Sequence, residues 1–435
     1  MKKVLAKLAV GFGAVAMLAA CGGNNDNGNE VNNENDGNNN NGEAASADGD
    51  ANVVLYSTMQ SDGERGAFEE IVADFESENP GITIEANFPG GSYEDQLRVM
   101  MAADDLPDLF DTHGWSQLRY GDYTEDLADM DWVENLDPAM DQIIKDDEGK
   151  VYTYPLNQAQ DGIIYNVDIL DEHGIEPPTT WDDFKTALET IRDEGDGTVA
   201  PLWIGGGDNW TIAQMVDQML TPTFITDDDN DYSEELLDGT FDWSKYEWLA
   251  EEILSLKEND LLNQDVLTAQ FAQTAEIMAN NQAAFMFIVG SVGPDATEMN
   301  PDTQVGLLPT PAVHEGDDPS WIGGERYTFS VAEKSEVKEE AKQFIDFLAQ
   351  EENAKKMAEA TNLSSALVNV EADTYYSEYY DMYSDLEIEP YFDRVYLPSG
   401  MWDVMANTTA ELLAGGTPEQ AANEMESEYH RLRDQ

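Results

Sequence analysis

Cysteine and histidine are both scarce in this chain of 435 residues. Cys21 is the only cysteine, so no disulfide can form within the chain and no cysteine nucleophile is available beyond that position. Four histidines lie far apart, without the spacing of a zinc site: His113, His173, His314 and His430. We therefore expect neither a metal nor a cofactor.

Basic residues are the second scarcity, with 21 Lys and Arg against 90 Asp and Glu. Residues 1–50 hold three lysines and seven acids, which leaves 18 basic and 83 acidic residues beyond them, a net charge of −65. A field of that sign excludes nucleic acid and anionic membrane surfaces as partners. The acids are spread along the whole chain, as on a solvated surface. We interpret this acidic protein as halophilic, because salt screens the repulsion between like charges.

One acidic run has the spacing that opens a calcium-binding loop. Residues 227–231 read Asp-Asp-Asp-Asn-Asp. Tyr232, however, occupies the position where such a loop needs glycine, and Asp238 the position where it needs glutamate. The sequence thus favours a solvated acidic segment over a calcium site.

Long apolar runs are absent, which predicts that no helix spans a membrane. The chain opens with three lysines and a short apolar stretch, the pattern of a secretory signal peptide. Leu18-Ala19-Ala20-Cys21 resembles the lipobox of bacterial lipoproteins, in which the cysteine is lipidated. We therefore expect residues 1–20 to be a lipoprotein signal peptide and Cys21 to carry the lipid. Residues 21–50, rich in Asn, are expected to be a disordered tether on the extracellular face of the cell membrane.

Strand and helix patterns alternate beyond the tether. Residues 52–56 read as a buried strand, a helix with its apolar stripe from Phe68 to Phe75 follows, and 82–86 read as the next strand. This βαβ unit predicts an α/β fold with a parallel sheet. Further strands are expected at 109–110, 162–165, 284–289, 304–308 and 327–331, and further helices at 181–192, from 337 and from 417. Some 385 residues are too many for one core, so we expect two lobes, with ligand bound beyond the carboxyl ends of the strands.

Motifs for covalent catalysis are missing. No GxSxG elbow and no phosphate-binding loop occurs, and the triple glycine at 205–207 lacks the Lys-Ser/Thr that a phosphate loop needs. A pair of carboxylates suited to glycoside hydrolysis could occur by chance among so many acids. A secreted glycoside hydrolase therefore stays open as an alternative, and no catalytic residue is assigned.

Tryptophans divide into two groups by their surroundings. Four lie in helix-like or turn segments and are expected to fill packing: Trp132, Trp181, Trp243 and Trp248. Five lie in glycine-containing loops next to strands, where a large ring is a poor core candidate: Trp115, Trp203, Trp210, Trp321 and Trp402. Flat indole faces suit the C–H face of a pyranose ring, and carboxylates and arginines suit its hydroxyls. The loop tryptophans thus indicate a sugar-binding site.

The run from Phe68 to Ile82 has the pattern of a first helix followed by a second strand. It resembles this part of family 1 extracellular solute-binding proteins, which serve carbohydrate ABC importers and include the maltose-binding and multiple-sugar-binding proteins. Further segments that resemble the family follow in the expected order at 106–110, 162–168, 178–183, 282–286, 341–348 and 416–421. Each segment alone is weakly specific, but the set covers essentially the whole chain after residue 51.

The resemblance implies a two-lobed periplasmic-binding-protein fold of type II, with the ligand cleft between lobes joined by hinge crossings. The crossings are expected near Gln160-Asp161, near Gly323–Glu325 and around Glu371–Tyr380. The N-terminal lobe would then comprise residues 51–160 and 324–372, and the C-terminal lobe residues 161–323 and 373–435.

The resemblance also implies a set of ligand contacts. The expected ligand-binding residues are Thr58, Gln60, Tyr93, Asp111, His113, Trp115, Gln160, Asp161, Asp208, Trp210, Trp321, Glu325, Arg326 and Trp402. One departure affects ligand preference. Family members commonly carry a sugar-stacking tryptophan after a late strand, where this chain reads Gly290-Ser291-Val292.

The leading hypothesis is a lipid-anchored, monomeric solute-binding protein without enzymatic activity. It would capture a mono- or oligosaccharide and deliver it to the permease subunits of an ABC importer. The alternative within the binding class is a cationic solute such as a betaine, held in a tryptophan cage and attracted by the acidic field.

Overall fold

The computed structural model describes residues 51–435 apart from 60, 147, 289 and 435. The expected signal peptide, the lipidated Cys21, the tether and Gln60 therefore lie outside the described residues. None of the helices in the described part of the chain has the length and apolar character needed to cross a bilayer.

The N-terminal lobe is built on a five-stranded sheet in the order β2-β1-β3-β11-β4. Strand β1 pairs in parallel with β2 and β3, whereas β11 pairs antiparallel with β3 and β4. Its strands are β1 (Ala51–Tyr56), β2 (Ile82–Asn87), β3 (Leu109–Phe110), β4 (Tyr154–Pro155) and β11 (Thr328–Val331).

Helices α1 (Asp62–Glu78), α11 (Lys338–Leu348) and α12 (Glu351–Thr361) pack together with the strands of this lobe. Ser61 and Glu64 form the capping box that starts α1. The apolar stripe expected from the sequence is buried, and Phe68 contacts Phe329 and Phe344 at ring-centroid distances of 5.5 and 5.9 Å. This aromatic cluster ties segments from both ends of the chain into one core.

The C-terminal lobe contains a four-stranded sheet in the order β7-β8-β6-β9. Successive residues of β6 enter different cores: Ile163 and Tyr165 join one cluster, and Ile164 joins another. This alternation shows that the sheet is covered on both faces. Its strands are β6 (Ile163–Asn166), β7 (Ala200–Leu202), β8 (Ala283–Met286) and β9 (Val305–Leu308).

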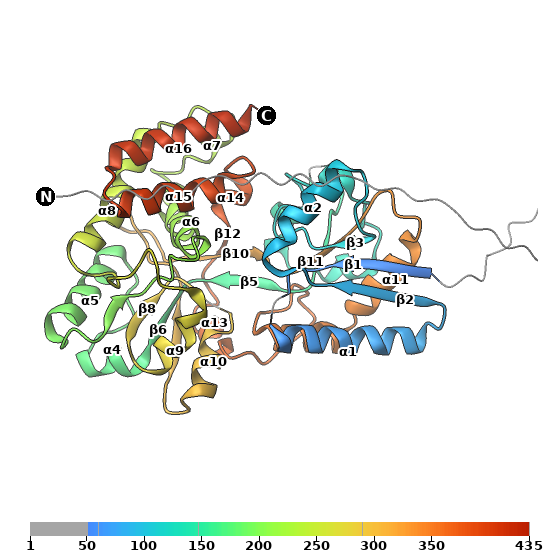
Figure 1. Ribbon diagram of the computed structural model, residues 1–435, viewed down its shortest axis with the longest axis horizontal. Coiled ribbons are helices and arrows are strands. Elements are labelled where there is room, and N and C mark those ends of the chain that lie inside the picture. The colour runs from blue at the N-terminus through green and yellow to red at the C-terminus, as the bar shows by residue number, and fades with distance from the viewer. Residues whose placement is uncertain (1–50, 60, 147, 289, 435) are drawn as a thin grey trace, which may run out of the picture. The chain divides into compact units, whose positions relative to one another are not determined.

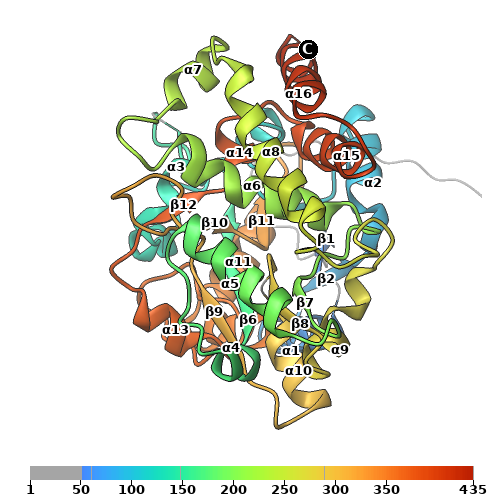
Figure 2. The same ribbon diagram turned by 90° about the vertical axis from the view of Figure 1, so that its left-hand side faces the viewer.

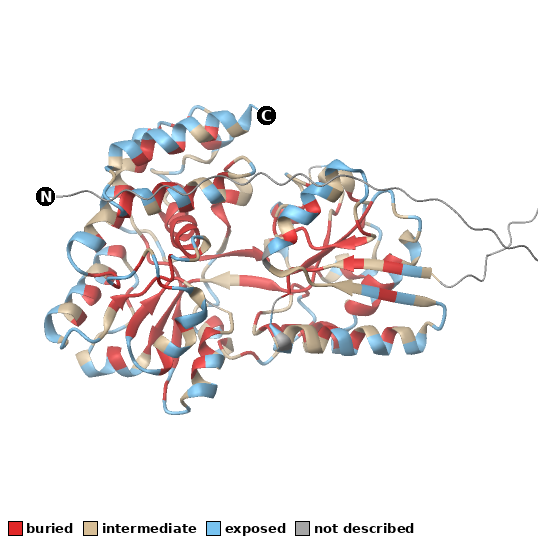
Figure 3. Cartoon of the chain, in the orientation of Figure 1, coloured by how far each residue is buried: buried red, intermediate tan, exposed pale blue. Residues whose placement is uncertain are grey.

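A layer of helices packs on one face of this sheet and completes the larger of the two cores. Helix α6 (Trp210–Phe224) packs against α15 (Met401–Leu413), which in turn packs against α16 (Pro418–Arg433), and α16 contacts α8 (Tyr246–Glu258) (Figure 2). Helix α5 (Trp181–Glu194) packs near β7 and contributes five buried side chains. Buried residues concentrate on the strands and on the inner faces of the helices (Figure 3).

A third, three-stranded sheet in the order β12-β10-β5 connects the two lobes. Strand β10 (Trp321–Glu325) pairs antiparallel with β5 (Gln158–Asp161) and parallel with β12 (Ile388–Pro390). Both β5 and β10 run between the two larger sheets (Figure 1). A Cβ atom built on Gly323 would overlap the Ala159 carbonyl oxygen, so only glycine permits this strand pairing.

The remaining helices are short, and several position loops at the strand ends. They are α2 (Tyr93–Ala102), α3 (Asp141–Ile144), α4 (Val167–His173), α7 (Ser233–Asp238), α9 (Thr274–Ala279), α10 (Val292–Met299), α13 (Ser377–Met382) and α14 (Phe392–Val395).

The structure confirms the two-lobed α/β class and corrects three details. The parallel βαβ unit formed by β1, α1 and β2 is present as predicted, but both large sheets are mixed. They are mixed because β11 and β6 each run antiparallel to both of their neighbours. The expected strand at 284–289 is shorter, since β8 ends at Met286, and β12 of the connecting sheet was not expected.

Candidate functional site

The loops that follow β1 and β3 are joined by one buried carboxylate. Asp111 is fully buried and accepts hydrogen bonds from the Thr58 backbone and hydroxyl, the His113 backbone, and the Thr328 backbone and hydroxyl. The Tyr93 hydroxyl donates to the Asp111 carbonyl oxygen. The carboxylate of Asp111 thus has protein donors on both oxygens, and it fixes the loop rather than facing outward.

Trp115 lies at the end of that loop as a partly exposed ring. The Arg119 guanidinium stacks on it with its carbon 4.2 Å from the ring centroid, and the His113 ring meets it edge-on at 5.7 Å. Glu94 accepts from Arg119 at 2.6 Å and lies 3.2 Å from His113 Nδ1. Burial raises the pKa of Glu94, but the hydrogen bond to His113 and the charges of His113 and Arg119 hold it below its ordinary value. These contacts fix the orientation of the indole.

The connecting sheet contributes a second polar group. Asp161 on β5 accepts hydrogen bonds from the Gln214 amide at 2.8 Å and the Tyr391 hydroxyl at 2.6 Å. Its burial raises the pKa of the carboxyl, against the opposing effects of Arg326 and these donors. The Arg326 guanidinium, which is half-buried, has no hydrogen bond or ion pair with any other described residue. It is therefore available to a ligand.

Glu325 at the end of β10 is the most unusual of the acids. It is fully buried, and neither carboxylate oxygen has a hydrogen-bond partner among the described residues. Burial raises its pKa to about 7, although the Arg394 guanidinium opposes this rise from 3.8 Å. Buried acceptors without donors are costly and uncommon.

A pair of buried carboxylates lies beside Glu325. Asp217 on α6 accepts the backbone N–H groups of Phe392 and Asp393 at 3.2 and 2.8 Å. Burial, followed by the charge of Asp393, raises the pKa of Asp217, and burial raises the pKa of Asp393 to about 6. The positive charge of Arg394, which follows in the chain, opposes both of these rises in pKa. Several ionisable side chains with shifted pKa values thus gather where the connecting sheet meets both lobes.

The C-terminal lobe presents further aromatic rings near the ends of β7 and β8. Trp203, Phe271 and Met286 line a small hollow there. Trp210 meets Phe271 edge to face at 4.9 Å, while Asp208 accepts the Phe271 backbone N–H at 2.8 Å. Asp208 and Trp210 therefore support this loop. Trp402 is half-buried at the start of α15, against the large core.

Trp321 and Gln160, which are both expected ligand contacts, have contacts within the protein. Trp321 is only 1% exposed and lies between Tyr380 and Tyr383 at centroid distances of 5.5 and 6.0 Å, so the expectation that it stacks on a ligand is wrong for this structure. A ring that is almost completely enclosed by protein cannot stack on a sugar. The Gln160 side chain accepts from the Ser364 hydroxyl at 3.3 Å, which occupies its carbonyl oxygen.

The structure brings most expected residues into two groups. Thr58, Tyr93, Asp111, His113 and Trp115 lie together in the N-terminal lobe, and Asp161, Glu325 and Arg326 lie together at the connecting sheet. Sequence reasoning missed the side chains that organise these groups: Glu94, Arg119, Gln214, Tyr391, Asp393 and Arg394. One available signal was the scarcity of basic residues in so acidic a chain. Each arginine was therefore a candidate for a specific partner.

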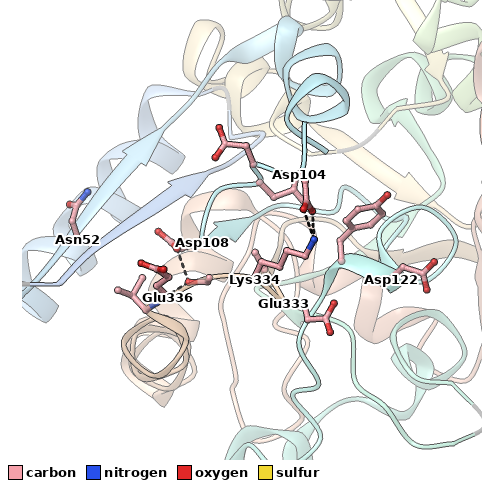
Figure 4. A pocket seen from close by; sticks show the side chains of 13 residues that line it. Asn52, Asp104, Asp108, Asp122, Glu333, Lys334 and Glu336 are labelled. Atoms are coloured by element: carbon pink, nitrogen blue, oxygen red, sulfur yellow. Dashed lines mark hydrogen bonds and ion pairs between the residues drawn. The ribbon is translucent and has the colours of Figure 1, made fainter. Parts of the chain in front are cut away.

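A cavity of about 480 Å³ lies elsewhere, at the opposite edge of the N-terminal sheet (Figure 4). Asn52 at the start of β1 and Asp108 just before β3 line it, so it adjoins the amino ends of these strands. Lys334 points at Asp104, and Ser335 donates to Asp108 at 2.6 Å. Its other charged residues are acids, and no stacking tryptophan reaches it. Within the described ranges, no cluster of His, Cys, Asp or Glu could hold a metal ion, the acidic run at 227–231 included.

Two lobes joined by a thin sheet, with unpartnered polar groups and an oriented indole at the junction, define a solute-binding protein. The chain belongs to the family of bacterial extracellular solute-binding proteins, which it matches over residues 61–355. This is a family of binding proteins and not of enzymes, so a glycoside hydrolase is no longer a candidate.

Relatives of known name agree with that assignment. The chain is 49% identical to the melibiose/raffinose/stachyose-binding protein MelE of Bacillus subtilis over 88% of this chain and 90% of the relative. A binding protein of Bacillus subtilis solved in an open conformation is 48% identical, with a TM-score of 0.83 over 88% of this chain and 98% of that one. A sugar transporter protein of Bacillus licheniformis in complex with stachyose is 54% identical, with a TM-score of 0.82 over 88% of this chain and all of that one.

Proposed function

We propose that this protein captures a galactose-containing oligosaccharide such as melibiose, raffinose or stachyose and delivers it to an ABC importer. The observation that carries the sugar class is the oriented Trp115 ring beside the Arg394 guanidinium, which lies 3.8 Å from a Glu325 carboxylate that has no hydrogen bond among the described residues. An indole face accepts the apolar face of a pyranose, while a carboxylate and a guanidinium bind its hydroxyls. The three sugars are those for which the relative that is 49% identical is named, and stachyose is bound in the structure that is 54% identical.

The ligand contacts are proposed from both sides of the junction. Trp115 and His113 on one side, and Asp161 and Arg326 at the connecting sheet, are partly exposed and are proposed to touch the sugar. Glu325 is fully buried beside them, and its contact with the sugar stays a prediction. Thr58, Tyr93 and Asp111 hold the loop that carries Trp115, and Asp208 and Trp210 hold a loop of the other lobe. Gln60, Gln160 and Trp402 complete the proposed set.

The segment Gly290-Ser291-Val292 supports the proposal that the ligand site differs from that of relatives with a tryptophan there. Val292 is buried in the core of the C-terminal lobe, and the next residue, Gly293, donates its N–H to Tyr376. No aromatic platform projects from these residues. Trp203 and Phe271 lie near the ends of the same sheet's strands and are the aromatic groups available on that lobe.

The site disfavours a cationic solute such as a betaine. Arg119 already occupies a face of Trp115, and Arg326 and Arg394 add two further positive charges within the same group of residues. A quaternary ammonium placed on the Trp115 ring would therefore be repelled by these arginines. A neutral sugar avoids this cost.

The proposed cellular setting follows from the amino-terminal segment. Residues 1–20 would be removed as a signal peptide, and Cys21 would carry the lipid anchor. Residues 21–50 would hold the folded monomer away from the extracellular face of the cell membrane, where it would contact the permease. The lobe boundaries proposed are 51–160 with 324–372 and 161–323 with 373–435. The separate apolar cores support this division, since one draws its residues from 53–156 and 327–370.

Calorimetric titration with stachyose, raffinose, melibiose, sucrose and glycine betaine tests the function. We expect the three galactosides to bind and sucrose, which lacks the galactosyl unit of raffinose, to bind more weakly. Trp115→Ala and Arg326→Ala should each weaken binding at least about tenfold, whereas Arg98→Ala, an exposed arginine, should not. No galactoside binding tighter than about 100 µM, roughly −5.5 kcal/mol, would overturn the proposal.

A further inference from the structure

Arg394 is an almost fully buried arginine of the site, with 7% of its side chain exposed. It lies in α14, just after β12 of the connecting sheet. Its guanidinium carbon is 3.9 Å from the centre of the Tyr391 ring, and its Nη1 donates to the Glu325 carbonyl oxygen at 2.8 Å. The same nitrogen is 3.8 Å from the Glu325 carboxylate. The arginine is thus fixed from the side of the connecting sheet.

The other side of the guanidinium rests on the N-terminal lobe. A Cβ atom built on Gly114 would overlap three guanidinium atoms of Arg394. Gly114 has φ +89°, a conformation that favours glycine, and the Trp115 ring centre is 5.7 Å from the guanidinium carbon. The two residues are separated by 280 positions and come from different lobes, so this contact depends on how the lobes are joined.

Unpartnered buried polar atoms surround the contact. Arg394 Nε and both carboxylate oxygens of Glu325 are buried without a hydrogen bond among the residues described. Trp115 and Asp393 interact with each other, and this interaction opposes the rise in the Asp393 pKa. The arginine nitrogen is a donor, and the two carboxylate oxygens are acceptors. A sugar hydroxyl both donates and accepts, so it matches such a set, while an apolar ligand would leave the set unsatisfied.

We propose that Arg394 is a positioning residue of the ligand site, which holds the Glu325 carboxylate and the Trp115 ring in one arrangement across the two lobes. This inference rests on the proposed function, because the arrangement is the one that binds the sugar. Arg394 supplies the positive charge that keeps Glu325 able to accept hydroxyl hydrogen bonds, and it packs on Gly114 when the lobes adopt the binding arrangement. Affinity should therefore depend on Arg394 and on the space at Gly114.

The pH dependence of binding reports on the same arrangement. Glu325 is faced by Arg394, which favours its ionised form, and by Asp111 and Asp393, which oppose it. With a pKa of about 7, Glu325 ionises near neutral pH. A hydroxyl that donates to the carboxylate stabilises its ionised form, so raffinose affinity should rise as pH increases through about 7. Removal of Arg394 should move this rise to higher pH.

Calorimetry with raffinose at pH values from about 5.5 to 8.5 tests the proposal on the full folded chain. Arg394→Met should weaken binding at least about tenfold and move the inflection upward in pH. Arg394→Lys, which keeps the charge but not the planar fork, should weaken binding while leaving the inflection near that of the wild type. Melting temperatures, measured on each variant, establish that the proteins compared are folded.

Gly114 offers an independent variant if Arg394→Met fails to fold. Gly114→Ala should weaken raffinose binding, because the new methyl group occupies the position of the guanidinium. Gly149→Ala is the matched control, since Gly149 has φ +91° and open space where a Cβ atom would lie. Alanine at position 149 therefore introduces the same backbone strain without a steric clash. Unchanged affinity and pH profile in Arg394→Met, or equal effects of the two glycine variants, would overturn the proposal. Failure of the wild-type protein to bind any galactoside would instead overturn the proposed function.

Discussion

At the residue scale, three buried carboxylates should govern how stability depends on pH. Burial raises the pKa values of Asp217, Glu325 and Asp393, which lie together around Arg394. A group whose pKa is higher in the folded state binds its proton more tightly there than in the unfolded chain. Between the two pKa values the folded protein still holds a proton that the unfolded chain has released. The free energy of unfolding therefore falls as pH rises through that window.

Glu325→Gln tests this at one residue. For Glu325 the window runs from 4.5 to about 7, and the corresponding loss is roughly 3 kcal/mol at most. The neutral amide cannot ionise, so the variant should be more stable than the wild type above pH 7 and should lose less stability across the window. Urea unfolding at several pH values measures the difference. Glu336→Gln, at an exposed position, is the control and should leave the pH profile unchanged.

At the scale of the elements, the connecting sheet tolerates little change in its close strand pairing. Strand β10 approaches β5 through Gly323, where the Ala159 carbonyl oxygen occupies the place of a Cβ atom. The clash involves two backbones, so it cannot be relieved by moving a flexible side chain. The element that links the lobes therefore requires glycine at this position.

Gly323→Ala should lower the melting temperature and weaken sugar binding, because separating β10 from β5 displaces Glu325 at the end of the same strand. Gly66→Ala provides the opposite case. Gly66 lies inside α1 with open space around its Cβ position, so alanine there should raise stability by about 0.5–1 kcal/mol. Thermal unfolding of both variants distinguishes the two outcomes. Equal stabilities of Gly323→Ala and the wild type would contradict the role assigned to the close pairing.

At the scale of the whole molecule, the net charge of −65 beyond residue 50 should act against compactness at low salt. Part of this charge lines the cavity of Figure 4, where Lys334 is the single basic residue among the lining acids. Elsewhere one lysine pairs with two acids, since Lys185 lies 3.4 Å from Asp182 and 2.8 Å from Glu252. Such pairs cannot balance the excess of acids.

Added NaCl should therefore raise the melting temperature. The Debye length shrinks from about 30 Å at 0.01 M to about 3 Å at 1 M, which screens the repulsion. Affinity for a neutral sugar should change little over the same range. A melting temperature that stays constant or falls would contradict the halophilic interpretation. Sodium sulfate is unsuitable as the only salt, because it also strengthens apolar burial by exclusion from the surface.

The sequence alone determined the features that depend on neighbours along the chain. The apolar spacing from Phe68 to Phe75 specified α1, and Thr417 with Gln420 specified the capping box that starts α16, as the structure confirms. Strand and helix order followed from such local patterns, because backbone periodicity and capping act over a few residues. The two-lobed class followed from the chain length and from the resemblance to a known family. The loop at Asp111–Trp115 was also identified this way, since it directly follows a strand.

Only the tertiary structure decided which side chains of the site act together. Asp111 meets Thr328 across 217 positions, and Arg394 rests on Gly114 across 280, distances in sequence at which no local pattern carries information. For Trp321, the local sequence pattern led to a wrong prediction. Its glycine-containing surroundings indicated an exposed loop, but the tyrosines that bury it come from a segment some 60 residues later. Burial and pairing depend on chain topology, which places distant segments in contact and so determines which polar groups remain free for a ligand.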